Sequence, residues 1–166
     1  MTLGHVTHAT HNGVHVLRYF GSVNYTLAPG LQRFLDGIIH DGRVSGLVFD
    51  LSAAESLDST NLGLMARANE EVRDAGAGNS VIISSNEDID GVLRSMGFDQ
   101  SFEVVASGEA AETDAEPVES APPSAAELQR TMIEAHRALM RLSEAGRLEF
   151  EPVVACLERD LSMNRV

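Results

Sequence analysis

Apolar residues in the first third of the chain change from strand spacing to helix spacing. The segments His5–Thr10 and His15–Phe20 read as two strands joined by a type I′ turn, because Asn12-Gly13 tolerates the positive φ angles of that turn. From Leu27 the apolar residues recur at helical spacing, with Pro29 in the first turn. The pattern therefore predicts an antiparallel hairpin followed by an amphipathic helix.

Two later apolar runs are typical of strands buried on both faces of a sheet. Gly46–Leu51 is the expected central strand, and Val81–Ser84 is the second buried strand. A helical stripe follows each run, the first beginning near Leu62 and the second ending at Gly97. With Phe102–Val105 as an edge strand, the predicted order is β-β-α-β-α-β-α-β, a mixed α/β sheet flanked by helices.

The composition changes after residue 106. Residues 107–124 are rich in Ala, Glu, Pro and Ser and carry no basic residue, which predicts a disordered acidic linker between a domain at 1–106 and a helical hairpin at 125–166. Ser124 to Glu127 matches a capping box, and Gly146 interrupts the helical spacing before a second, shorter helix. Two short helices are unstable alone, so we expect the hairpin to dock on the first domain, on a second copy as a homodimer, or on a partner.

Charge and cysteine content limit the functions open to the chain. A formal net charge of -13 argues against binding to nucleic acid or to an anionic membrane surface. Cys156 is the single cysteine among 166 residues, so an intrachain disulfide and a CxxC site are both excluded. No apolar stretch reaches the length of a membrane span or a secretion signal. These observations favour a cytoplasmic protein.

The most informative segment begins in the central strand and reads Val-Phe-Asp-Leu-Ser-Ala-Ala-Glu-Ser-Leu-Asp-Ser-Thr-Asn-Leu-Gly, residues 48–63. It resembles the central motif of STAS domains, the family of bacterial anti-anti-sigma factors (anti-sigma factor antagonists), in which a strand ending in Asp-Leu precedes an Asp-Ser-Ser/Thr-Gly-Leu-Gly helix start. The resemblance spans about Gly13 to Val105 and includes Leu93–Phe98. It implies the STAS fold for the first domain, with the C-terminal αα-hairpin as an addition.

The resemblance also implies a phosphorylation site. Ser59 stands at the position of the phosphoacceptor of the family, and Thr60 is the less favoured acceptor. A hydroxyl at a loop-to-helix junction is expected to be exposed to a kinase, and the helix N-terminus favours a phosphate. The motif residues Asp58, Ser59, Thr60, Asn61 and Leu62 are expected, together with Asn24, to contact the partner. Asn24 stands where the family often has Asp and is a near substitute for it, and Asn61 replaces the usual Gly.

By this resemblance, the unphosphorylated protein binds an anti-sigma factor that is also a serine kinase, and so releases a sigma factor for stress or lifestyle transcription. A PP2C-type phosphatase, including forms linked to response regulators, resets the switch. Two alternatives belong to other classes of protein. One is a constitutive STAS subunit of a transport or lipid-trafficking complex, and the other is a small-ligand sensor.

Simpler interpretations stand beside these. Asp58 and Ser59 are also ordinary N-cap residues. The four histidines of the predicted strands suggest a metal site by their number, but strand alternation leaves only His8 and His15 on a shared side, so we predict no metal site. Cys156 is expected to be a packing or surface residue. The chain contains no GxSxG, Walker, CxxC or HExxH motif, and so no enzyme activity and no cofactor are predicted.

Overall fold

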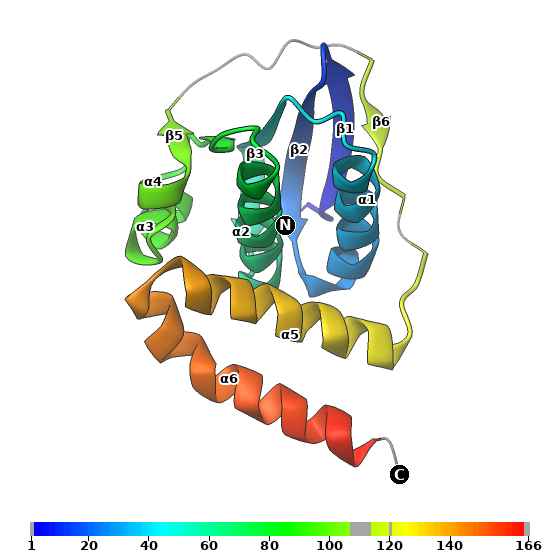
Figure 1. Ribbon diagram of the computed structural model, residues 1–166, viewed down its shortest axis with the longest axis vertical. Coiled ribbons are helices and arrows are strands. Elements are labelled where there is room, and N and C mark those ends of the chain that lie inside the picture. Colours follow the sequence, from blue (N-terminus) through cyan, green and yellow to red (C-terminus); the bar gives the residue numbers. More distant parts are fainter. Residues whose placement is uncertain (1, 107–113, 120, 165–166) are drawn as a thin grey trace.

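The computed structural model describes residues 2–106, 114–119 and 121–164. These residues form a six-stranded mixed sheet and the helices that pack on it (Figure 1). The strand order is β5-β4-β3-β2-β1-β6. Strands β2, β3, β4 and β5 are mutually parallel, whereas β1 is antiparallel to both of its neighbours. The predicted mixed α/β sheet is confirmed. The strands are β1 (His5–His11), β2 (Val14–Val23), β3 (Gly46–Leu57), β4 (Val81–Ile83), β5 (Glu103–Val105) and β6 (Glu116–Pro117).

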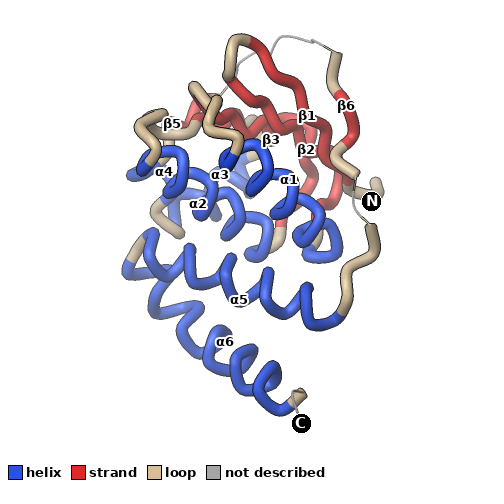
Figure 2. The backbone as a smooth tube through the Cα atoms, turned by 45° about the vertical axis from the view of Figure 1, so that its right-hand side comes forward, coloured by secondary structure: helices blue, strands red, loops and turns tan. Residues whose placement is uncertain are grey.

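The helices of the first domain cover one face of this sheet (Figure 2). They are η1 (Tyr25–Leu27, a 3₁₀ turn), α1 (Ala28–His40), α2 (Ser59–Asp74), α3 (Glu87–Ser95) and α4 (Phe98–Ser101). The predicted element order is confirmed, and the short helix α4 is added to it. Gly97 separates α3 from α4 with a φ of 85°, a left-handed conformation that glycine adopts without steric cost.

The turn between β1 and β2 is the type I′ turn predicted from its dipeptide. Asn12 and Gly13 have φ angles of 51° and 79°. The antiparallel register then pairs His11 with Val14 directly across the turn. Two adjacent positive φ angles match the twist of the flanking strands, which explains why this short sequence signal was sufficient.

Strand β3 is longer than the apolar run that predicted it. The run ends at Leu51, but the strand continues to Leu57, because its backbone pairs with β2 as far as Val23. The prediction of a strand ending at Leu51 was therefore wrong at its C-terminal end. Backbone pairing needs no apolar side chain, and Ser52 and Ala53 in the extension are exposed.

The predicted linker contains a short strand. Residues 107–113 and residue 120 lie outside the described part of the chain, but β6 pairs with Thr7 and His8 of β1. In addition, the backbone N–H of Val118 donates to the carbonyl of Val6 at 2.9 Å. At these residues the expectation of disorder was wrong. The reason is that β1 would otherwise leave an unpaired backbone edge, which an acidic, Pro-containing segment can still pair with.

The C-terminal hairpin consists of α5 (Ala125–Leu142) and α6 (Glu144–Met163). Its turn lies at Ser143, whose hydroxyl caps α6 by accepting from the N–H of Gly146, so the predicted break at Gly146 was wrong. Gly146 instead lies inside the first turn of α6, where an added Cβ would be 2.2 Å from the carbonyl oxygen of Leu139. The glycine permits close packing of the two helices, and α6 is longer than α5 rather than shorter.

The hairpin packs on the first domain, which was one of the three predicted possibilities. In both views α5 crosses below α1 and α2, near their N-terminal ends, and α6 lies beyond it (Figures 1 and 2). Ala135, Ala138 and Leu139 of α5 are buried in the same apolar core as residues of the sheet. The molecule is therefore layered as sheet, first helical layer, α5 and α6.

Candidate functional site

The predicted phosphoacceptor lies at the junction between β3 and α2. Asp58 is extended, with φ of -87° and ψ of 171°, and its side chain accepts a hydrogen bond from the backbone N–H of Asn61 at 3.0 Å. Asp58 is thus the N-cap and Ser59 is the first residue of the helix. The N-cap interpretation holds for Asp58, and it leaves the hydroxyl of Ser59 available for another contact.

That contact is made by the C-terminal hairpin. The Oγ of Ser59 lies 2.9 Å from the Nε2 of His136, and the Nδ1 of the same ring lies 2.6 Å from the carbonyl oxygen of Met132. A carbonyl only accepts, so Nδ1 carries a proton, and in the neutral ring Nε2 then accepts the hydrogen of the Ser59 hydroxyl. The His136 ring is 3% exposed and packs against Phe150, with ring centroids 5.2 Å apart. Ser59 is half-buried, contrary to the expectation of an exposed hydroxyl.

The other predicted site residues differ widely in exposure. Thr60, Asn61 and Leu62 are buried, whereas Asp58 is half-buried and Asn24 is exposed. The Asn24 side chain accepts from the backbone N–H of Thr26 at 3.0 Å and caps the 3₁₀ turn. The structure thus brings residues 58–62 together at one helix end, but Thr60 and Asn61 are unavailable for direct contact with a partner in this conformation.

The contact between α5 and α2 extends well beyond Ser59. An added Cβ on Gly63 would lie 2.2 Å from the carbonyl oxygen of Ala135, so the two backbones meet without a side chain between them. Farther along α2, Glu70 pairs with Arg141 at 3.0 Å. Ser59 and Gly63 thus make the closest contacts of the interface between α2 and α5, and the Glu70–Arg141 ion pair lies at the exposed edge of that interface.

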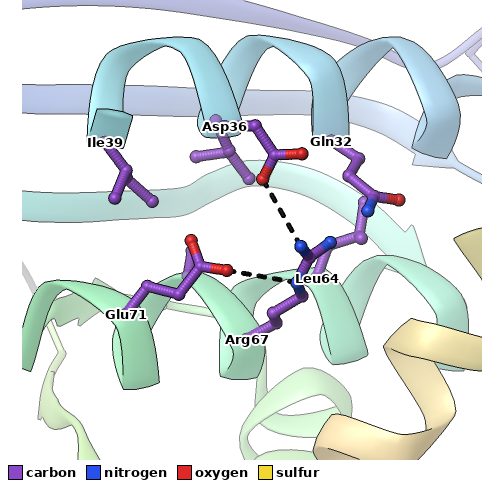
Figure 3. A pocket seen from close by; sticks show the side chains of 8 residues that line it. Gln32, Asp36, Ile39, Leu64, Arg67 and Glu71 are labelled. Carbon is purple, nitrogen blue, oxygen red and sulfur yellow. Dashed lines mark ion pairs between the residues drawn. The ribbon is translucent and has the colours of Figure 1, made fainter. Parts of the chain in front are cut away.

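Arg67 of α2 links three helices. It lies 3.7 Å from Asp36 of α1, 3.2 Å from Glu71 and 2.9 Å from Glu134 of α5. Figure 3 shows its guanidinium group directed toward Asp36 and Glu71 in a narrow hollow between α1 and α2. Burial raises the pKa of Glu71, and Asp36 adds to this, while Arg67 opposes it. The polar part of the interface is therefore a shared network, with α5 supplying one of its carboxylates.

On another side of α2, an open hollow of about 250 Å³ lies beside the same helix end. Its apolar lining includes Leu57, Leu62 and Ile89, and its acidic lining includes Glu55 and Asp88. An apolar side chain next to a basic residue would suit this combination. The hollow remains open while α5 is docked.

The histidine pair predicted to share one side of the hairpin does so. The Nε2 of His8 lies 2.8 Å from the Nδ1 of His15, and the two rings are stacked. Burial is the main cause that lowers the pKa of both rings, and His15 lowers that of His8 further. Within the described residues, no group of three or more potential ligand side chains is placed to hold a metal ion. Cys156 is exposed.

His136 is the residue of this candidate site that the sequence did not identify. It lies beside the apolar stripe of α5, four residues after Met132, where an ordinary pattern would place an apolar side chain. A buried polar residue normally has a hydrogen-bond partner, so its position could have indicated a contact. Nothing in the sequence, however, indicates that the partner is Ser59, which lies 77 positions earlier.

Comparison with known proteins gives consistent results. A family model described as the STAS domain matches residues 5–111. The "Anti-sigma-F factor antagonist RsfB" of Mycobacterium tuberculosis is 32% identical over 100 residues, which are 58% of this chain and 77% of RsfB. None of the described helices is long and apolar enough to cross a membrane.

Solved structures of the same fold include an anti-sigma factor antagonist from Mycobacterium paratuberculosis, with 23% identity and a TM-score of 0.56 over 63% of this chain and 87% of that one. SpoIIAA in its unphosphorylated form has 17% identity and a TM-score of 0.53 over 62% and 88%. Bacillus SpoIIAA in its phosphorylated form has 18% identity and a TM-score of 0.52 over 63% and 93%. The family match ends at residue 111, before the hairpin begins.

Proposed function

We propose that this chain, which belongs to the STAS domain family of anti-sigma factor antagonists, is a switch controlled by phosphorylation of Ser59. When Ser59 is unmodified, the protein binds an anti-sigma factor that is also a serine kinase, and a sigma factor is released. Phosphorylation weakens that complex, and a PP2C-type phosphatase restores it. The observation that carries the proposal is the place of Ser59 in the motif, at the first position of α2.

Helix-end chemistry supports the choice of Ser59. The first backbone N–H groups of a helix have no partner within the helix, and its N-terminus carries partial positive charge. A phosphate on Ser59 would lie near both. SpoIIAA adds support, because that protein has been solved in both a phosphorylated and an unphosphorylated form.

Charge explains why a phosphate would change binding. A phosphoserine adds a charge of about -1.5 to -2, which a partner must neutralise or desolvate. On a chain with a net charge of -13, the favourable partner surface is basic. The open hollow lined by Leu57, Glu55 and Asp88 lies beside the same helix end and would accept an apolar side chain with a basic neighbour.

Burial ranks the predicted contact residues. Ser59, Asp58 and Asn24 are at least partly exposed and are proposed to contact the partner directly. Thr60 is buried, which makes it a poor acceptor for a kinase, and Asn61 and Leu62 act by shaping the helix end. The homodimer through the hairpin stays a prediction, since the inner face of α5 packs within the chain.

The experiment measures the intact mass of the full chain after incubation with ATP and a candidate anti-sigma kinase from the same organism. One phosphate is expected on the wild type and on Thr60→Val, and none on Ser59→Ala. Pull-downs with Ser59→Ala and Ser59→Asp should recover the kinase with the first variant and much less with the second. A protein that carries no phosphate at Ser59 in its host, under growth or stress, contradicts the proposal. Recovery of a membrane transport complex with both variants would favour a constitutive STAS subunit.

A further inference from the structure

We infer that the C-terminal hairpin is an intramolecular cover for the Ser59 surface, and that it must leave α2 before Ser59 can be modified or a partner can dock there. The inference rests on the proposed function for its biological consequence. The covering itself follows from contacts between α2 and α5, and α5 lies outside the family match, which ends at residue 111.

The first observation is that the Ser59 hydroxyl is already in use. Its hydrogen is donated to the Nε2 of His136 at 2.9 Å, and the ring behind that nitrogen is buried. In the side-chain conformation that Ser59 adopts here, a phosphate bonded to Oγ would occupy the space where the ring lies. Phosphorylated Ser59 and docked α5 are therefore mutually exclusive in this arrangement.

The second observation is that α5 cannot shift slightly to make room. The backbone carbonyl of Ala135 lies directly on Gly63, one helical turn from Ser59. At the end of α5, the hydroxyl of Ser143 donates to the carbonyl of Met96 at 2.7 Å, and its Cβ lies 2.8 Å from where a Cβ on Gly97 would stand. Contacts inside α5 and at its C-terminal end fix the helix, so exposure of Ser59 requires release of α5 as a unit.

The third observation concerns the strength of the cover. The α5 residues buried in the core shared with the first domain are Leu139 and two alanines, and Met140 and Leu142 pack against that core while only partly buried. The surrounding ion pairs, such as Arg141 with Glu70, are about half exposed. Small side chains and exposed ion pairs contribute little to stability, so release costs less than unfolding of the sheet.

The consequence is a reduced apparent affinity. A partner that binds only the uncovered form has a dissociation constant raised by the inverse of the uncovered fraction. The same factor slows a kinase that needs Ser59 exposed. The hairpin thus sets the threshold of the switch, and weakening its contact lowers that threshold without touching Ser59.

The test uses a thiol as the probe of exposure, so it requires neither kinase nor partner. The background is the full chain with Cys156→Ser, which removes the exposed native thiol, and Ser59→Cys is added to it. The rate of reaction with a disulfide reagent is divided by the rate of the same protein in concentrated urea, which corrects for intrinsic reactivity. Ser56→Cys in the same background is the matched control, because Ser56 is exposed three residues earlier.

The thiol introduced by Ser59→Cys is expected to be protected relative to the thiol introduced by Ser56→Cys. Adding Ala135→Glu, which places a charge against Gly63, should raise the labelling at position 59 at least about tenfold and leave the labelling at position 56 unchanged. Equal labelling at the two positions in the hairpin-intact chain would overturn the inference. So would an unchanged rate at position 59 in a folded Ala135→Glu protein.

A second measurement needs no substitution and applies even if Ala135→Glu fails to fold. Hydrogen exchange of the wild-type chain should show α5 and the first turn of α2 opening together, at least about tenfold more often than β3. If α5 exchanges only with β3, the hairpin is a permanent part of the core and no cover exists. Neither measurement depends on phosphate, so failure here is distinct from failure of the proposed function.

Discussion

The sheet core and the contact between α5 and α2 are both buried, yet they are built from different materials. In the sheet, Leu17, Tyr19 and Phe49 are all fully buried at 0% exposure, so large side chains fill the space. At the contact, Gly63 meets Ala135 backbone to backbone, and polar groups surround that point. The sheet core is therefore held by large side chains, whereas the contact between α5 and α2 requires that no large side chain lie between the two backbones.

This difference separates the stability of the fold from the stability of the cover. Burial of a large apolar side chain contributes about 1.5–3 kcal/mol, and exposed ion pairs contribute about 0–1 kcal/mol. The sheet should therefore survive conditions that release α5. A close contact without side chains is nevertheless sensitive to shape, because any added atom disrupts it.

The largest effect is expected from Phe49→Ala. Removing a fully buried aromatic ring from the central strand should lower the free energy of unfolding by about 3–5 kcal/mol, through lost burial and the cavity that remains. Urea denaturation followed by circular dichroism measures it. Leu148→Ala is the control, since Leu148 is 63% exposed. If Phe49→Ala lowered the free energy of unfolding no more than Leu148→Ala, the sheet core would not depend on large side chains, and its contrast with the contact between α5 and α2 would be wrong.

An intermediate effect is expected from Gly63→Ala. In a helix interior this change normally adds up to about 1 kcal/mol of stability, but here the methyl group would meet the Ala135 carbonyl and cost about 1–3 kcal/mol. The loss should be confined to α5 and α6, which hydrogen exchange can locate. Gly91→Ala is the matched control, because no other heavy atom lies within 4 Å of its added Cβ. If both variants are stabilised equally, α5 does not rest on Gly63.

The smallest effect concerns pH and the edge of the sheet. The pKa of His8 is lowered by burial and by His15, against Glu116, and that of His15 is lowered by burial, against Asp41. The unfolded chain, with histidines near pKa 6.5, then takes up protons before the folded one does. Stability that is full above about pH 6.5 is therefore lost as the pH falls through that value toward the lowered pKa.

Urea midpoints at about pH 7.5 and about pH 5.5 measure this loss on either side of the histidine range. The wild type should weaken on acidification, and His15→Gln should weaken less. His40→Gln, which removes an exposed imidazole elsewhere, serves as the control and should behave as the wild type. Hydrogen exchange should place the change in β1 and β2. An acid-induced change located in α5 would contradict the prediction, because the pH response would then not arise from His8 and His15.

The sequence predicted features that depend on neighbours along the chain. The turn at Asn12-Gly13 and the apolar central strand as far as Leu51 follow from local geometry. The extension of β3 to Leu57 and the strand at Glu116 could not be predicted in this way, because backbone pairing across the sheet leaves no apolar pattern. Composition predicted a linker around Glu116, but this segment forms a strand because the backbone edge of β1 is open to pair with it.

The same division applies to the candidate site. The motif located Ser59 and its cap, Asp58, because the end of a strand and the start of a helix are local features. It could not show that His136 binds the hydroxyl, since that contact depends on how a distant helix docks. The exposure of a site residue depends on the whole chain, even when its identity depends on a few neighbours.

The short strand β6 has a consequence for how the hairpin competes. Because Glu116 and Pro117 are paired with β1, only residues 118–124 connect the sheet to α5. A hairpin released from α2 stays on this short tether, at an effective concentration on the order of millimolar. A free partner in the cell must therefore outcompete a ligand that never diffuses away, and the length of this tether becomes a means of tuning the response without altering either binding surface.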